Sequence, residues 1–177
     1  MRQVIYGGAI SLDGFLAGPG ESIDWLRYSD ESAKLIAQSF EGVDVMLMGR
    51  KTFEFAQRMG GGPPVKGVTT YVFSQTMDCL PEGANGELVG EDVADFVRRM
   101  KSEPGGKILV MGGGELGSAL IGAGLVDEIG FSIHPVMLGG GVPAFRGFDH
   151  RIQLKLVEAR AIVPECVLVR YNVVNQS

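Results

Sequence analysis

Histidine and cysteine are scarce in this chain of 177 residues, which contains two of each. Cys79 and Cys166 stand far apart without paired spacing, so the sequence offers neither a disulfide framework nor a zinc site and is typical of a reducing compartment. His134 and His150 are too few for a histidine-rich metal centre. We therefore expect a cytoplasmic protein without a bound metal.

Positive charge is also in short supply. Lys and Arg number 16 against 21 Asp and Glu, which gives a formal net charge of −5 and leaves no basic excess to neutralise phosphates. Residues 4–6 form an apolar stretch too short for a signal peptide. Residues 108–126 carry one charge, but three consecutive glycines would expose helix backbone to lipid. We therefore expect neither nucleic acid nor a membrane as a partner, and we expect a small-molecule substrate.

Glycine, in contrast, is abundant, with 27 residues. No three-residue period is present, which excludes collagen, and 45% hydrophobic residues exclude a disordered chain. Many glycines are clustered, at 7–8, 60–62, 105–106, 112–114 and 139–141. Clustered glycine in a well-packed protein indicates backbone that closely approaches something else.

The apolar pattern predicts one α/β domain over residues 1–177. Expected strands cover residues 4–10, 43–48, 68–73, 107–111 and 129–133, and expected helices cover residues 30–40, 50–59, 92–101 and 115–122. The helices at 50–59 and 92–101 are expected to stop at the glycine and proline residues that follow them. Two further β-rich runs, from 152 and from 167, are joined by a turn near Pro164 without a helix between them, so they should pair antiparallel. We predict a mainly parallel sheet of seven or eight strands with an antiparallel C-terminal hairpin.

A glycine turn follows the strand at 107–111 and opens a helix. Residues 112–117 satisfy the pattern G-x-G-x-x-G, and glycines there let backbone N–H groups face a pyrophosphate. The surrounding context of a Rossmann fold is missing, because the motif is not on the first strand and Asp127 follows too soon. Close packing of helix on strand explains the same glycines equally well.

The strand expected at 43–48 is also followed directly by a helix, the one expected at 50–59. Gly49 is followed by Arg50, Lys51 and Thr52, whose cations and hydroxyl suit a terminal phosphate such as the 2′-phosphate of NADPH. A solvated helix start is the alternative. Ser74 and Gln75 follow the next strand, at the same carboxyl edge where open α/β sheets bind ligands.

Taken in order, these segments resemble the dihydrofolate reductase fold. The resemblance is carried by residues 4–17, 45–52, 71–74 and 110–114, and it sharpens with Leu125-Val126-Asp127-Glu128 and Pro135-Val136-Met137-Leu138-Gly139-Gly140-Gly141. With these segments, the chain is most similar to the C-terminal reductase domain of the bifunctional riboflavin-biosynthesis protein and to its small stand-alone relatives. The resemblance implies a three-layer α/β fold, NADPH as cofactor and a homodimer.

It also implies site residues. Phosphate and pyrophosphate binding is implied for Gly49, Arg50, Lys51, Thr52, Ser74, Gln75, Gly112, Gly113, Gly114, Glu115 and Leu116. Contact with the nicotinamide is implied for Ala9, Leu16 and Ala17, beneath a mobile lid formed by residues 11–20. Asp13 and Trp25 are expected at the substrate.

The implied reaction is hydride transfer to a C=N bond of a pyrimidine or pteridine, as in 5-amino-6-(5-phosphoribosylamino)uracil reductase. Asp30 stands five residues after Trp25, the spacing of the proton donor in folate reductases, although core packing and a helix start explain both residues too. The substrate-phosphate segment of the riboflavin enzymes is replaced here by Gly60-Gly61-Gly62-Pro63-Pro64. A dihydrofolate or pteridine reductase, or a nucleotide sensor without chemistry, therefore remains an alternative. His134 is interpreted as a structural residue at a strand end.

Overall fold

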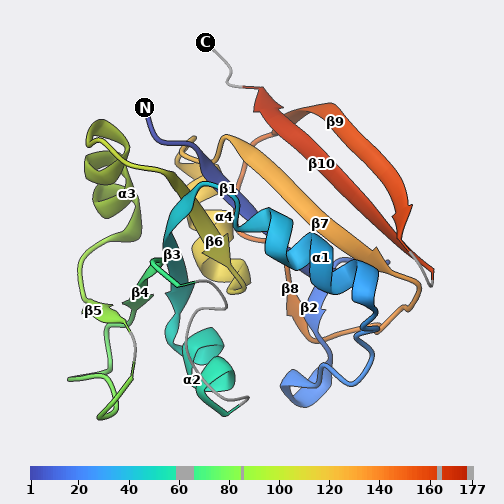
Figure 1. The fold of residues 1–177 in the computed structure, drawn as a ribbon, viewed down its shortest axis with the longest axis horizontal. Coiled ribbons are helices and arrows are strands. Elements are labelled where there is room, and N and C mark those ends of the chain that lie inside the picture. Colours follow the sequence, from blue (N-terminus) through green and yellow to red (C-terminus); the bar gives the residue numbers. More distant parts are fainter. Residues whose placement is uncertain (59–65, 85, 163–164, 175–177) are drawn as a thin grey trace.

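Short apolar runs form the strands on which the rest of the protein is built (Figure 1). The structure, a computed structural model, describes residues 1–58, 66–84, 86–162 and 165–174. Its main sheet has eight strands in the order β5-β4-β3-β6-β1-β7-β10-β9. The strands of this sheet are β1 Val4–Ser11, β3 Val43–Gly49, β4 Thr69–Phe73, β5 Glu87–Val89, β6 Lys107–Met111, β7 Glu128–His134, β9 Gln153–Ile162 and β10 Cys166–Val174.

Within the described residues, four α-helices complete the layers: α1 Asp30–Ser39, α2 Arg50–Arg58, α3 Val93–Ser102 and α4 Gly114–Gly122. A 3-10 helix, η1, spans Pro19–Glu21. Local sequence signals explain where two of them begin. Ser29 and Ser32 form a capping box at the start of α1, and the Asp92 carboxylate accepts hydrogen bonds from two N–H groups of α3. No helix in the part of the chain that the structure describes is long and apolar enough to cross a membrane.

The two faces of the sheet differ in how well they are covered. Helices α3 and α4 pack on one face in a continuous core that includes Tyr6, Leu120 and Phe131. On the other face, Phe53 of α2 belongs to a second core. Helix α1 crosses this same face (Figure 1) and buries none of its own residues. The sheet beneath α1 is therefore left open to a cleft.

The predicted α/β architecture is confirmed. Strands β1, β3, β4, β5, β6 and β7 pair parallel, and β10 pairs antiparallel with both β7 and β9. Sequence patterns missed three short strands, β5, β2 (Phe15–Ala17) and β8 (Val142–Pro143). The predicted glycine stop at 60–64 and the turn near Pro164 lie outside the described residues.

Residues 11–20, predicted as a mobile lid, include a short strand. They contain β2, which pairs antiparallel with β8. Further backbone hydrogen bonds run from the N–H of Leu12 to the oxygen of Val136 and from the N–H of Ala144 to the oxygen of Gly14. Residues 11–20 are therefore held to the chain that follows β7, and their movement as a lid stays a prediction.

Candidate functional site

A cleft of about 1640 Å³ opens along the carboxyl edge of the sheet and continues beneath α1. Every residue predicted to bind the cofactor lines it, although the sequence spreads these residues over more than a hundred positions. They are Ala9, Leu16, Ala17, Gly49, Arg50, Lys51, Thr52, Ser74, Gln75, Gly112, Gly113, Gly114, Glu115 and Leu116. The parallel strands place these residues together because β1, β3, β4 and β6 all end at this edge.

Two glycine turns adjoin each other where β3 and β6 end. Gly112 and Gly113 have φ angles of 62° and 63°, in the left-handed region that favours glycine. A Cβ on Gly112 would lie 2.7 Å from Oγ1 of Thr52, whereas a Cβ on Gly49 would meet no atom within 4 Å. The first N–H groups of α4 lack helical partners and carry the positive end of the helix dipole. This turn is therefore suited to an anionic ligand.

The glycines farther along the same motif serve packing instead. A Cβ on Gly114 would overlap the carbonyl oxygen of Pro143, and a Cβ on Gly117 would overlap the Tyr6 ring. Tyr6 is fully buried and its hydroxyl donates a hydrogen bond of 2.7 Å to the oxygen of Ala144. The packing interpretation of the glycine motif therefore holds for Gly117, which permits close helix–sheet contact. Gly112 and Gly113 form the turn, and binding of a pyrophosphate there stays a prediction.

The cations beside the turn are already paired with carboxylates. Nη1 of Arg50 lies 2.9 Å from Glu54, one helical turn farther along α2, and Nζ of Lys51 lies 3.0 Å from Glu21. Both pairs are partly exposed, and such surface pairs contribute about 0–1 kcal/mol. A phosphate could therefore exchange for either carboxylate at little cost.

Small side chains form the floor of the cleft beneath α1. Gly7 and Ala9 of β1 pair with Gly130 and Ser132 of β7, and all four line the cleft. Leu35 of α1 lines it from above. The small residues leave room between helix and sheet for a flat ligand.

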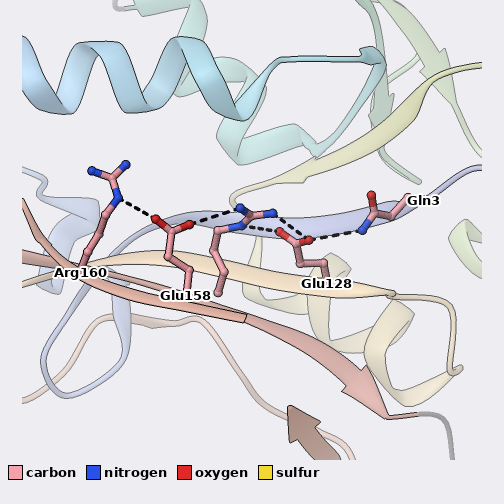
Figure 2. A network of polar contacts seen from close by, with 5 residues as sticks. Gln3, Glu128, Glu158 and Arg160 are labelled. Atoms are coloured by element: carbon pink, nitrogen blue, oxygen red, sulfur yellow. Dashed lines mark hydrogen bonds and ion pairs between the residues drawn. The ribbon is translucent and has the colours of Figure 1, made fainter. Parts of the chain in front are cut away.

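A row of alternating charges forms one wall of this space (Figure 2). Arg170 of β10 donates hydrogen bonds to Glu128 at 2.8 Å and to Glu158 at 3.3 Å. Glu158 also accepts from Nε of Arg160 at 2.7 Å, which holds the pKa of this carboxyl below its ordinary value. Gln3 donates to Glu128 at 3.3 Å, so each carboxylate in the row has two partners.

Three predicted residues lie elsewhere. Among the described residues that line the cleft, Asp13, Trp25 and Asp30 are absent. The Asp13 carboxylate accepts hydrogen bonds from Ser11, at 2.6 Å, and from the backbone N–H of Gly139, at 2.8 Å. These bonds hold the pKa of Asp13 at about 2.

Trp25 and Asp30 likewise make contacts outside the cleft. The Trp25 indole donates to the backbone oxygen of Ser22, and its ring meets His134 edge-on at 5.4 Å between centroids. Asp30 is exposed in the first turn of α1, next to the Ser29 cap. A carboxylate at this end interacts favourably with the positive end of the helix dipole. The structure therefore does not place the predicted proton donor in the cleft.

Sequence reasoning gave too little weight to β7. Its residues alternate, so that Ile129 and Phe131 enter the core while Gly130, Ser132 and His134 line the cleft. A period of two between apolar and small or polar residues is visible in the sequence and could have identified this face. Within the ranges that the structure covers, His, Cys, Asp and Glu side chains nowhere gather in a group of three that could hold a metal ion.

Comparison with known proteins identifies the family of this chain. The model of the RibD C-terminal domain matches residues 2–168. The uncharacterised protein YyaP of Bacillus subtilis strain 168 is 31% identical over 97% of this chain and 95% of its own length.

Solved structures share the fold. A putative riboflavin biosynthesis protein from Shewanella sp. PV-4 has a TM-score of 0.82 and 23% identity, with 99% of this chain and 100% of that chain covered. A diaminohydroxyphosphoribosylaminopyrimidine deaminase/5-amino-6-(5-phosphoribosylamino)uracil reductase from Thermotoga maritima has a TM-score of 0.71 and 16% identity, covering 98% of this chain and 57% of that one. Dihydrofolate reductase from Enterococcus faecalis, in complex with NADP(H), has a TM-score of 0.69 and 16% identity, covering 98% and 97%.

Proposed function

Since the chain belongs to the RibD C-terminal domain family, we propose that it is an NADPH-dependent reductase acting on a C=N bond of a pyrimidine-type substrate. The name of the Thermotoga maritima protein supports the substrate class, and the NADP(H) complex of the Enterococcus faecalis enzyme supports the cofactor. A compound of the 5-amino-6-(5-phosphoribosylamino)uracil type is the first candidate substrate.

One observation supports this proposal most strongly: two glycine turns from different crossovers meet at the carboxyl edge of one sheet. The turn at Gly112 and Gly113 would be closed by any larger side chain at Gly112, which would collide with Thr52. Arg50 and Lys51 supply positive charge beside it. Open backbone next to cations in a long cleft fits a dinucleotide with several phosphates.

The residues that line the cleft would bind different parts of NADPH, according to their position. Gly49, Arg50, Lys51 and Thr52 would bind the adenosine-side phosphates, together with Ser74 and Gln75. The N-terminal turn of α4, from Gly112 to Leu116, would bind the pyrophosphate. Ala9, Leu16 and Ala17 would flank the nicotinamide.

NADPH, when bound, supplies the hydride that is added to the carbon of the C=N bond. The small residues of β1 and β7 would let a flat heterocycle lie close to the nicotinamide end of the cleft, which orients the reacting atoms. Because Asp30 does not line the cleft, we infer that water reaching the open cleft delivers the proton to nitrogen.

A turnover assay tests the proposal. Purified protein is mixed with NADPH and either 5-amino-6-(5-phosphoribosylamino)uracil or dihydrofolate, and the loss of NADPH absorbance is followed beside product analysis. We expect stoichiometric oxidation of NADPH with the uracil compound. Reduction of dihydrofolate alone would instead identify a pteridine reductase. Tight NADPH binding without turnover of either compound would identify a sensor.

A matched pair of glycine variants ties turnover to the cleft. Gly113 and Gly124 have similar left-handed φ angles of 63° and 67°, but only Gly113 lines the cleft. Alanine at either position costs about 1–2 kcal/mol in backbone strain. We expect Gly113→Ala to raise the KM for NADPH about tenfold and Gly124→Ala to leave it unchanged, because only the first adds a methyl group where phosphates bind.

A further inference from the structure

His134 is a buried polar residue that the proposed mechanism does not use. It is the last residue of β7 and is 5% exposed. It pairs with Ser11 of β1, two residues beyond the pair formed by Ala9 and Ser132. Its side chain lines the cleft on the same face of the sheet as Gly130 and Ser132. His134 therefore stands beside the strand end that would flank the nicotinamide.

One ring nitrogen of His134 has a fixed role. Nδ1 lies 3.2 Å from the backbone nitrogen of Arg27 and accepts its hydrogen bond, so Nδ1 carries no proton. Burial, together with the charge of Arg27, holds the pKa of His134 below its ordinary value. The neutral imidazole consequently carries its proton on Nε2.

The other nitrogen, Nε2, is free to bind something else. Among the residues that the structure describes, none forms a hydrogen bond with it. Among the described residues, Oγ1 of Thr70 is the one enclosed side-chain N or O atom without a partner, so Nε2 of His134 reaches the solvent of the cleft, where an acceptor atom of a ligand can take the place of water. The Trp25 ring stands edge-on to the imidazole at 5.4 Å and restricts its rotation.

We propose that His134 recognises the substrate, donating a hydrogen bond from Nε2–H to a carbonyl oxygen or an unprotonated ring nitrogen of the heterocycle. This inference rests on the proposed function and adds a specificity-determining residue to it. Because the imidazole is held in one tautomer, Nε2–H can only donate a hydrogen bond. It therefore favours a heterocycle that presents an oxygen at this place over one that presents an amino group. A pyrimidine with oxo groups, such as a uracil, fits this requirement.

Binding to variants tests the role of His134. Gln at this position keeps an N–H donor near the place of Nε2, and Leu removes it. The exposed His150, which does not line the cleft, provides the matched control His150→Gln. Affinities for NADP⁺ and then for 5-amino-6-(5-phosphoribosylamino)uracil are measured by calorimetry on each folded protein.

We expect His134→Leu to weaken binding of the uracil compound about tenfold, as loss of one hydrogen bond predicts, and His134→Gln to weaken it less than about threefold. Affinity for NADP⁺ should stay unchanged in both variants, which shows that the cleft remains folded. Unchanged affinity of His134→Leu for the uracil compound contradicts this inference alone. Failure of the wild-type protein to bind that compound contradicts the proposed substrate and this inference with it.

An NMR measurement checks the tautomer without relying on a variant at this position. The chain has two histidines, so ¹⁵N-histidine labelling of His150→Gln leaves one imidazole to observe. We expect a neutral ring protonated at Nε2, whose Nε2 signal moves when the uracil compound is added and stays in place with NADP⁺ alone. A ring protonated at Nδ1, or an Nε2 signal unmoved by the uracil compound, would overturn the inference.

Discussion

Asp13 connects two segments that are far apart in the sequence. Its carboxylate accepts hydrogen bonds from the Ser11 hydroxyl and from the N–H groups of Leu138 and Gly139. The resemblance to reductases predicts Asp13 at the substrate, but the structure gives this carboxylate partners within the fold. A carboxylate in a turn-forming loop is compatible with either role, so the sequence did not distinguish them.

Replacement of Asp13 by Asn should lower the free energy of unfolding near neutral pH, because the amide accepts fewer hydrogen bonds. The folded-state pKa of about 2 lies below the ordinary value of 3.8, so the stabilisation is present above pH 3.8 and is lost as the pH falls toward 2. Urea unfolding of wild type and Asp13→Asn at several pH values measures this. A stability difference that stays constant down to pH 2 would contradict the structural role.

Helix α4 shows how one element serves both the core and the cleft. Its first turn faces the cleft with Gly113 at the N-cap, while Leu116 and Leu120 enter the core. Gly117, on the same helix, faces the Tyr6 ring. A sequence pattern that matched a dinucleotide motif therefore combines a turn that lines the cleft with a packing contact.

The packing role of Gly117 leads to a stability prediction. Gly117→Ala should destabilise the protein by about 1–3 kcal/mol, because a methyl group would overlap the buried Tyr6 ring. Gly122→Ala, whose Cβ would lie 3.8 Å from Phe148, is the matched control on the same helix and should be neutral or gain up to about 1 kcal/mol. Chemical denaturation of both variants decides the matter, and equal effects would show that the contact with Tyr6 is unimportant.

Long periodic elements were predictable, and elements that depend on distant partners were not. Helix α3 has its own N-cap, and strand β6 is a continuous apolar run, so the local sequence is sufficient to predict both elements. Strand β2 exists only because β8, far along the chain, pairs with it. For the same reason the residues that line the cleft at the strand ends could be predicted, whereas the hydrogen bond of His134 to Arg27 could not, since it joins segments far apart in the sequence.

At the scale of the whole molecule, strand order brings together the residues that are predicted to bind the cofactor. Strands β3 and β6 are neighbours in the sheet although two other strands separate them in the sequence, so their glycine turns share one edge. The cleft then extends from this edge across β1 and β7, beneath α1. The homodimer expected from the resemblance stays a prediction. The exposed Leu154 and Leu156 of edge strand β9 offer one apolar surface for it.

The central claim is that this edge binds NADPH through its phosphates, and Arg50 allows the most direct measurement. Arg50→Gln is compared with Arg98→Gln, which removes an exposed arginine on the opposite face of the sheet, and the Kd of each protein for NADPH and for NADH is measured. We expect Arg50→Gln to weaken NADPH binding about tenfold or more, the size of one charge-assisted hydrogen bond, with NADH binding unchanged. Equal affinities of wild type and Arg50→Gln for NADPH would contradict a phosphate site at the end of β3.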